Sequence, residues 1–222
     1  MVVAAPLHIT LRPEEGVART LDLHLVSDLG RLHLAIGRDL RSYPAQLTLR
    51  VYATHSSFAR ALWRDQRTRP QNELDDTSSI VHDTLLLGPA PSAYLWHNLA
   101  HVYTEWIIDQ TVGNRSDTLP SDPWLYDGLA EYEAYRQAPP GLRCSSGSTV
   151  PFDVTQIRTA QQWLAVRAGP LGSLEYCLSY LSARSFVQRV GWSRVVTILH
   201  GSGNWRQAAE RLRRISVQRV DR

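Results

Sequence analysis

The sequence predicts an α+β fold, with a small mixed β-sheet in the N-terminal half and a mainly helical C-terminal half. Segments with apolar residues at alternate positions, typical of strands, occur only in the first half of the chain. Later segments repeat apolar residues at helical spacing. No Gly/Ser-rich or Pro-rich linker and no internal repeat divides the 222 residues. We therefore expect a single domain, residues 1–222, with a full core.

The N-terminal half is expected to alternate strands with helices. In the second strand, Leu47, Leu49 and Val51 share one side and polar residues lie between them. Between the first two strands, apolar residues recur at helical spacing and predict one long helix over about 14–40. A short helix capped by the 55–57 segment should follow, and then a surface loop over 64–78. The strands are expected over residues 7–11, 46–53 and 80–87.

The C-terminal half is expected to be helical throughout. A helix over 92–112 ends at Gly113, and the next begins after Ser121 or Asp122 with Pro123 in its first turn, where a missing N–H costs little. A loop covers 141–151. Asn204 and Gln207 resemble a capping box that opens a last helix through Arg214. The helices between are expected over residues 155–166, 174–190 and 192–200.

Charge and composition argue against nucleic acid and membranes as partners. All 24 basic residues are Arg, the net charge is +3, and the arginines are spread along the chain without an aromatic-rich basic motif. No apolar run is long enough to span a membrane. Residues 1–6 are too short and uncharged for a signal peptide. We expect a cytoplasmic protein or a trimmed extracytoplasmic domain.

Two cysteines, Cys144 and Cys177, are too few for a disulfide framework and lack the spacing of a zinc ribbon. They can form one bridge if the fold brings them together. Two free thiols are the expectation.

Two histidines, His97 and His101, stand four residues apart within the helix predicted over 92–112. Residues at this spacing lie on one helix face. This is the arrangement of the zinc-binding HExxH helix, in which the intervening Glu is the general base; here that position holds Asn98. A catalytic zinc site takes three protein ligands. Asp127 on the next helix can supply the third, a carboxylate.

The segment that begins at Trp124 reads Trp-Leu-Tyr-Asp-Gly-Leu-Ala-Glu-Tyr. It resembles the segment Trp-Leu-x-Glu-Gly-x-Ala-x-Tyr of the gluzincin metallopeptidases, in particular the bacterial peptidase-MA-like domains, where it follows HExxH and its Glu binds zinc. The strand and helix near 47–54, the Ser-Phe-Val helix over 180–191 and the Gly-Ser-Gly turn before the amphipathic tail also fit. The resemblance covers nearly the whole chain and implies a gluzincin-like fold.

The resemblance implies a role for each matching residue. His97 and His101 take the two imidazole positions around one zinc ion, and Asp127 takes the third-ligand position. Glu131, one turn further on, matches an acidic residue that hydrogen-bonds the far nitrogen of a ligand histidine and fixes its tautomer. Tyr180 matches, more loosely, a tyrosine that steadies the oxyanion in related peptidases. Core packing is the alternative role for Tyr180.

The sequence departs from the family pattern at two positions. An amide such as Asn98 cannot take a proton from water, and a positioned general base contributes about 10²–10⁴-fold in rate. Glu105, one turn past His101, is expected to point beyond the metal, so we do not assign it as the base. Asp127 is one methylene shorter than Glu, which requires its helix to lie about 1–1.5 Å closer. Gly128 leaves room for that approach.

Three interpretations of function remain open. The first is a zinc metallopeptidase-like domain that has lost efficient hydrolysis, a pseudopeptidase that holds a peptide or protein segment in its cleft. The second is an active zinc-dependent hydrolase with an atypical base, because zinc alone lowers the pKa of bound water to about 7. The third is a metal-free scaffold that binds a peptide or protein elsewhere, with His97 and His101 as structural residues.

Overall fold

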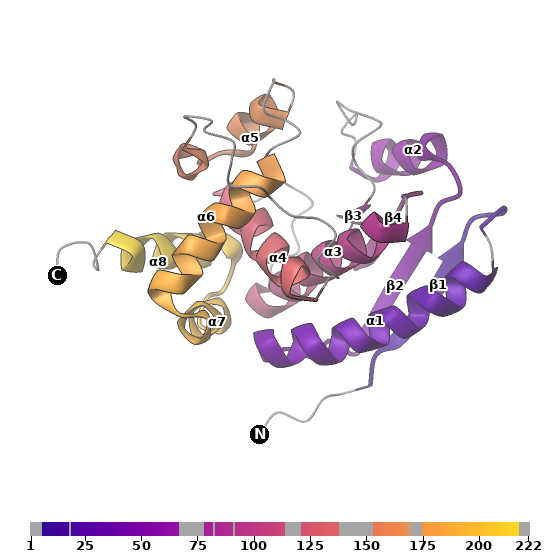
Figure 1. Ribbon diagram of the computed structural model, residues 1–222, viewed down its shortest axis with the longest axis horizontal. Coiled ribbons are helices and arrows are strands. Elements are labelled where there is room, and N and C mark those ends of the chain that lie inside the picture. Colours follow the sequence, from indigo (N-terminus) through magenta and orange to yellow (C-terminus); the bar gives the residue numbers. More distant parts are fainter. Residues whose placement is uncertain are drawn as a thin grey trace. The chain divides into compact units, whose positions relative to one another are not determined.

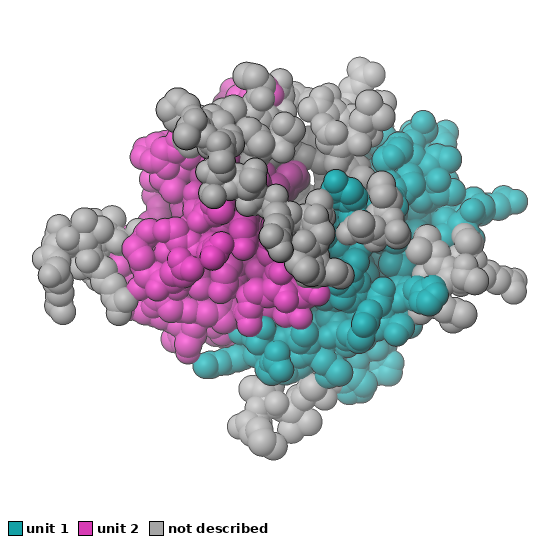
Figure 2. Space-filling view, viewed as in Figure 1, with its two compact units in different colours: residues 1–107 teal, residues 108–222 magenta. Residues whose placement is uncertain are grey.

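Strands occur only in the N-terminal half of the described chain, and the rest is helical (Figure 1), so the predicted α+β class is confirmed. The computed structural model describes residues 6–17, 19–66, 78–81, 83–90, 92–113, 121–137, 153–167, 169 and 175–217. The chain forms two compact units, residues 1–107 and 108–222, which Figure 2 shows in different colours. The boundary lies within one continuous helix, α3 (Ser92–Val112).

The first unit is built on a four-stranded mixed sheet in the order β1-β2-β4-β3. β1 pairs with β2 and β2 with β4 in parallel, whereas β3 and β4 are antiparallel. On β2 the side chains of Leu47, Leu49 and Val51 are buried and alternate with more exposed ones, as the sequence predicted. The strands are β1 (His8–Pro13), β2 (Gln46–Val51), β3 (Ser78–Val81) and β4 (Thr84–Leu87).

The single strand predicted over 80–87 is wrong, because the chain reverses inside it. Val81 pairs with Thr84, which makes β3 and β4 a tight antiparallel hairpin. Asp83 lies in the turn. Asp is a common turn residue, but the apolar residues on both sides of it concealed this signal.

Helix α1 (Arg19–Leu40) connects the parallel strands β1 and β2, which need a crossover of this kind. Its predicted apolar positions form the buried face: Leu25, Leu29, Leu32, Ile36 and Leu40. The helix begins five residues later than the predicted start at Glu14. The Glu14 N–H donates to Val51 O, and its carboxylate accepts from Ala53 N–H at 2.8 Å, so this segment is tied to the end of β2.

Helix α2 (His55–Gln66) covers the β3 side of the sheet. Its Phe58 and Leu62 form an apolar cluster with Val81 and Leu86. The cap is Thr54, whose hydroxyl accepts from the Ser57 N–H at 3.1 Å, so the predicted cap within 55–57 is displaced by one residue. The helix also continues past its predicted end at Trp63. The rest of the predicted 64–78 loop, over 67–77, lies outside the described residues, as does the 141–151 loop.

The second unit is helical, and four of its predicted helices are confirmed closely. Helix α3 ends at Gly113, where φ is +67°, as expected. Asn204 Oδ1 accepts from the Gln207 N–H at 3.0 Å, which confirms the predicted cap of the last helix. The helices here are α4 (Pro123–Gln137), α5 (Ala160–Arg167), α6 (Glu175–Val190), α7 (Trp192–His200) and α8 (Trp205–Val217).

The helix predicted over 155–166 is wrong in its first part. It divides into a short 3₁₀ turn, η1 (Val154–Gln156), and α5, with extended backbone at Ile157 between them. Thr159 Oγ1 accepts from the Gln162 N–H and Gln162 Oε1 accepts from the Thr159 N–H. This capping box starts a new helix after Thr159.

Helices α4 and α6 form the most extensive contact of the second unit. Most of α4 is buried, from Pro123 through Ala134 with few interruptions. Gly128 allows the close approach, because a Cβ there would lie 2.6 Å from the Ser179 carbonyl oxygen and 2.9 Å from Ala183 Cβ. The sequence analysis assigned Gly128 to an approach toward the histidine helix; within the second unit its close neighbour is α6.

Cys177 on α6 is disulfide-bonded, and its partner lies outside the described residues. The expectation of two free thiols is therefore wrong. Spacing along the chain carries no information on which cysteines the fold brings together.

Candidate functional site

Helix α3 places three potential metal ligands on one face at intervals of one turn. His97, His101 and Glu105 stand four residues apart, and residues at this spacing project from the same side of a helix. The two histidine residues are 7% and 8% exposed. Apolar residues on the other faces bury the helix within the first unit, including Leu99, Val102 and Ile107. The largely apolar helix α3 thus has three polar side chains on one face, and they are mostly shielded from solvent.

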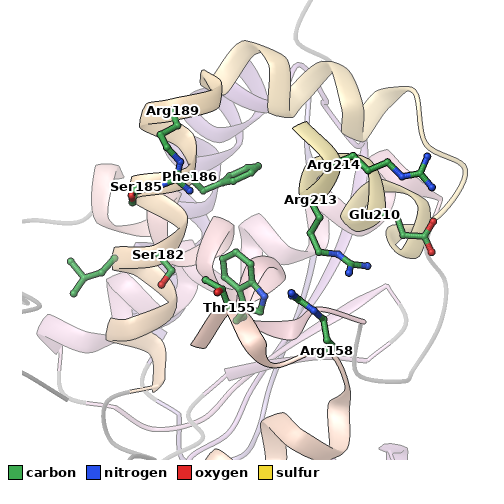
Figure 3. A pocket seen from close by; sticks show the side chains of 11 residues that line it. Thr155, Arg158, Ser182, Ser185, Phe186, Arg189, Glu210, Arg213 and Arg214 are labelled. Atoms are coloured by element: carbon green, nitrogen blue, oxygen red, sulfur yellow. Dashed lines mark hydrogen bonds between the residues drawn. The ribbon is translucent and has the colours of Figure 1, made fainter. Parts of the chain in front are cut away.

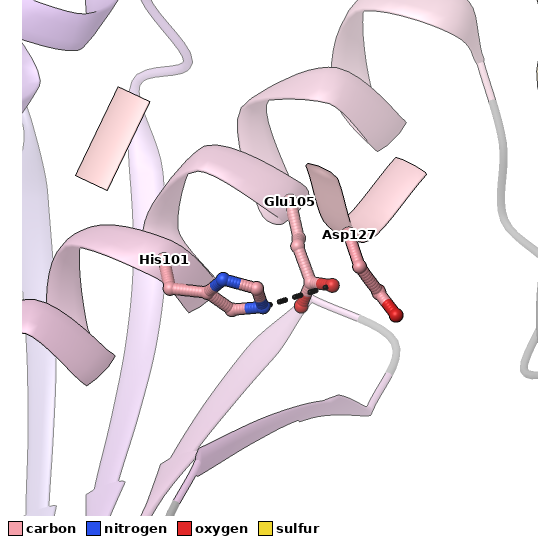
Figure 4. Close-up of side chains that lie close together, drawn as sticks. All are labelled: His101, Glu105 and Asp127. Atoms are coloured by element: carbon pink, nitrogen blue, oxygen red, sulfur yellow. Dashed lines mark ion pairs between the residues drawn. The ribbon is translucent and has the colours of Figure 1, made fainter. Parts of the chain in front are cut away.

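His101 and Glu105 form a close pair within this line. His101 Nε2 lies 3.3 Å from Glu105 Oε1, and their side chains are 10% and 14% exposed (Figure 4). With a neutral imidazole the contact is a hydrogen bond from Nε2–H, and with an imidazolium it is an ion pair. Shielding from water strengthens the contact in either state.

Glu105, which was not expected to take part in the site, contacts His101 on α3. The signal was present in the sequence, since Glu105 follows His101 by four residues, as His101 follows His97. The expectation that its carboxylate points beyond the metal followed from its position one turn past His101. Glu105 is therefore an additional candidate ligand or proton acceptor.

Asn98 follows His97 on α3 and is only partly buried. Its amide can donate and accept hydrogen bonds but has no basic nitrogen or oxygen at neutral pH. The general-base position of the HExxH pattern thus carries no base in this chain. A hydrolytic reaction here would need another proton acceptor.

A second buried polar contact anchors α3 to α1. His33 Nδ1 lies 2.8 Å from the Tyr103 hydroxyl, and both side chains are buried. Burial raises the pKa of Tyr103 far above its ordinary value, so the phenol stays protonated. The Thr104 hydroxyl donates to the Ala100 carbonyl at 2.7 Å. These contacts fix the helix that carries His101 without using its histidine face.

Helix α4 in the second unit carries the predicted carboxylates. Asp127 and Glu131 are 8% and 5% exposed, at i and i+4 on α4. Asp122 caps this helix through its carbonyl oxygen, which accepts from the Leu125 N–H at 2.9 Å. Burying two carboxylates on one helix face is costly unless they are hydrogen-bonded or paired.

Tyr180 on α6 stacks on Tyr135 of α4, with ring centroids 4.1 Å apart and planes at 26°. Tyr180 is partly buried. Offset stacking of this kind contributes about 0.5–1.5 kcal/mol beyond area burial. The contact describes a packing role for the ring, and the predicted oxyanion role of the hydroxyl stays a prediction.

No helix among the described residues combines the length and apolar character needed to cross a lipid bilayer. No family model, curated protein or solved structure matches this chain.

Proposed function

We propose that this protein is a zinc-binding, metallopeptidase-like domain whose hydrolytic power is strongly reduced. The observation that carries the proposal is the buried line of His97, His101 and Glu105 on α3, with His101 and Glu105 in contact at 3.3 Å. Imidazole and carboxylate side chains in a nearly dry site are the donor set that zinc prefers.

His97, His101 and Asp127 are the proposed ligands, with Glu105 as a further carboxylate. Asp127 belongs to the second unit, and its participation is part of the proposal. Its support is that a side-chain carboxylate is a common third zinc ligand beside two imidazoles. Glu131 is proposed to hydrogen-bond a ligand imidazole and fix its tautomer.

Asn98 is the reason for proposing weak hydrolysis. Zinc, when bound, lowers the pKa of its water to about 7 and polarises a peptide carbonyl. The residues of this chain must then bind the peptide and transfer the proton, and Asn98 cannot accept it. Loss of the base removes about 10²–10⁴-fold in rate. The protein would therefore hold a peptide or protein segment more effectively than it cleaves one.

The gluzincin-like relationship is part of the same proposal. Its support is that the two motif segments fold as single helices: residues 92–112 as α3 and residues 123–137 as α4, with Pro123 in the first turn. The mixed sheet precedes both helices. We also propose an oxidising compartment, because Cys177 is disulfide-bonded and such bonds persist mainly outside the reducing cytosol.

The test is the zinc content of the purified protein, measured by elemental analysis after incubation with zinc and gel filtration. Three variants accompany the wild type: His101→Ala, Asp127→Asn and the matched control His24→Ala, which changes an exposed histidine on α1. We expect about one zinc ion per chain in the wild type and in His24→Ala. Both site variants should lose it.

Two results would overturn the proposal. Zinc absent from the wild type even after incubation indicates the metal-free scaffold. Zinc retained in His101→Ala places the metal elsewhere. If Asp127→Asn retains zinc and His101→Ala loses it, Asp127 is not a zinc ligand. Wild-type peptide hydrolysis that a chelator abolishes would instead favour the active hydrolase, with Glu105 as the first candidate base.

A further inference from the structure

The second unit contains a cavity of about 840 Å³ between η1, α6, α8 and the start of α4. Four arginines line it: Arg158, Arg189, Arg213 and Arg214. Figure 3 shows Arg158 and Arg213 with their guanidinium groups directed toward one another. A volume of this size is within the range that holds small organic ligands. None of the proposed zinc ligands lines this cavity.

Asp122 holds two of these arginines in place. Its carboxylate is 3.1 Å from Arg158 Nη1 and 3.3 Å from Arg213 Nη2, and the residue is 2% exposed. The Asp122 N–H donates to the Arg158 carbonyl oxygen at 3.0 Å. The two guanidinium groups are thus positioned before any ligand arrives. Prior positioning lowers the entropy lost on binding.

The cavity has more positive than negative charge. Among the described residues that line it, Glu210 carries the only carboxylate, and Asp122 behind the wall is shared by two arginines. The Arg158 and Arg213 side chains are 42% and 38% exposed, so an incoming ligand can reach them. Guanidinium groups that face a common space favour a bidentate oxyanion.

Among the described residues, two buried donors in the wall have no hydrogen-bond partner. They are Trp124 Nε1 and Arg213 Nε. A buried donor left without an acceptor costs about 1–3 kcal/mol. Each of these two nitrogen atoms exposes less than 1 Å², so a ligand reaches them only if the side chains of the wall shift. Both side chains line this cavity.

Apolar and hydroxyl-bearing side chains line the cavity beside the arginines. Trp124 and Phe186 are 5% and 3% exposed and contribute apolar, aromatic wall. Ser182 and Ser185 add hydroxyl groups, and Arg189 donates to Ser185 Oγ at 2.8 Å. Figure 3 shows Phe186, Ser185 and Arg189 on the same helix, across from Arg213. The cavity therefore combines an anion-binding side with an apolar side.

We propose that this cavity binds a small organic oxyanion, a phosphate or carboxylate group on an apolar or aromatic body. The oxyanion contacts the guanidinium groups of Arg158 and Arg213, and the body lies against Phe186 and Trp124. This is a binding site separate from the proposed metal site, and it does not rest on zinc.

The test is isothermal titration calorimetry of the full chain with four probes: phenyl phosphate, benzoate, inorganic phosphate and benzylamine. Phenyl phosphate should bind saturably at one molecule per chain, and at least about tenfold more tightly than inorganic phosphate, which lacks the apolar body. Benzoate distinguishes a carboxylate site from a phosphate site. Benzylamine, the cationic counterpart, should show no saturable binding. Affinity for phenyl phosphate should fall as ionic strength rises.

Two variants assign the binding to the cavity. Arg213→Gln removes one guanidinium and should weaken phenyl phosphate binding about tenfold or more. The matched control is Arg206→Gln, which changes an exposed arginine on the same helix outside the cavity and should leave the affinity unchanged. Arg213→Lys keeps the charge and removes the planar fork, so it should still weaken binding if Arg213→Gln does not fold.

Three outcomes would overturn the proposal. They are no saturable binding of phenyl phosphate or benzoate, binding of benzylamine with equal affinity, and binding that Arg213→Gln and Arg213→Lys both leave unchanged. The zinc content of the wild type is independent of every one of these results, so failure of this site and failure of the metal site are distinguishable.

Discussion

The first unit carries shielded imidazole and carboxylate side chains, whereas the second carries partly exposed guanidinium groups. On α3 of the first unit, His97 and His101 are less than a tenth exposed, and their neighbour Glu105 is almost as well shielded. In the second unit, Arg158 and Arg213 are about four-tenths exposed at the rim of a cavity. The first set has the chemistry of a buried cation site, and the second has that of an accessible anion site.

Each unit is also stabilised internally by different contacts. The first depends on a hydrogen-bonded sheet and on Glu14, which ties the segment after β1 to the end of β2. The second depends on helix packing, with the close approach at Gly128 and the disulfide of Cys177. Substitutions confined to one unit therefore show which of these contacts stabilise that unit and the site it carries.

The largest expected effect is on catalysis at α3. Replacing the amide by a carboxylate in Asn98→Glu restores a proton acceptor at the general-base position. If zinc is bound as proposed, peptide hydrolysis should rise by about 10²–10⁴-fold. The measurement is the initial rate on a broad peptide library with zinc present.

The control for this change is Asn98→Gln, which lengthens the side chain in the same way without adding a base. It should leave the rate at the wild-type level. A variant Asn98→Glu that binds one zinc ion and remains as inactive as Asn98→Gln would show that the proposed ligand frame does not support hydrolysis.

The next largest effect is on the stability of the second unit. Reduction of the Cys177 disulfide should lower the free energy of unfolding by about 2–4 kcal/mol, because the unfolded chain regains the entropy that the bridge removed. Urea denaturation with and without a reducing agent measures the change. Cys177→Ser, which forms no bridge, is the control and should show no further response to the reducing agent. Equal midpoints for the oxidised and reduced wild type would contradict the prediction.

The contrast between the two sites also explains which of them the sequence could predict. The set on α3 lies on one helix at intervals of four residues, so helical periodicity alone brings His97, His101 and Glu105 to one face. Glu105 was named but not assigned as the base, because a residue one turn past His101 was expected to point beyond the metal. The arginines around the cavity lie just after η1 and on α6 and α8, at no regular spacing. No pattern within one element could reveal that they share a cavity.

The fold shows the same division between local and long-range information. Helices that end at a glycine, such as α3 before Gly113 and α7 before Gly201, were predicted with their correct bounds. The errors fall where a short side-chain contact ends or starts an element: the turn at Asp83, the capping box at Thr159 and the tie made by Glu14. These contacts depend on one or two residues, which periodicity averages away.

A matched pair of glycine substitutions compares the packing of the two units. In Gly128→Ala the new Cβ would meet the Ser179 carbonyl oxygen at 2.6 Å, so α4 must move from α6. We expect a loss of about 1–3 kcal/mol in stability. In Gly30→Ala on α1, nothing lies within 4 Å of the new Cβ, and helix propensity should add about 0.5–1 kcal/mol. Urea denaturation measures both.

The comparison depends on the sign of the change in unfolding free energy for each substitution. Opposite signs are expected, because one alanine meets backbone and the other meets open space. Unchanged or increased stability in Gly128→Ala would contradict the close approach at Gly128, and a loss of stability in Gly30→Ala would contradict the open space at Gly30. Since Asp127 is the adjacent residue on α4, Gly128→Ala should also reduce zinc content if the metal site forms as proposed, whereas Gly30→Ala should not.

The smallest effect is a pH dependence specific to the first unit. The hydrogen bond from the Ser57 hydroxyl, followed by that from the Ala53 N–H, lowers the pKa of Glu14 below its ordinary value of 4.5. A lowered carboxyl pKa in the folded state adds stability that is fully present above the unfolded value and is lost as pH falls through the folded value. Glu14→Gln should therefore cost about 1 kcal/mol near neutral pH. Below the folded pKa the variant and the wild type should converge.

The measurement is urea denaturation of both proteins from about pH 7 down to pH 3, with Glu15→Gln as the control. Glu15 is exposed and lies outside these hydrogen bonds, so its substitution should shift stability little at any pH. A constant difference between Glu14→Gln and the wild type across this window would show that the side chain acts through packing instead of charge. Convergence as the pH falls would show that an ionised carboxylate ties the segment after β1 to the end of β2, a support with no counterpart in the disulfide and glycine packing of the second unit.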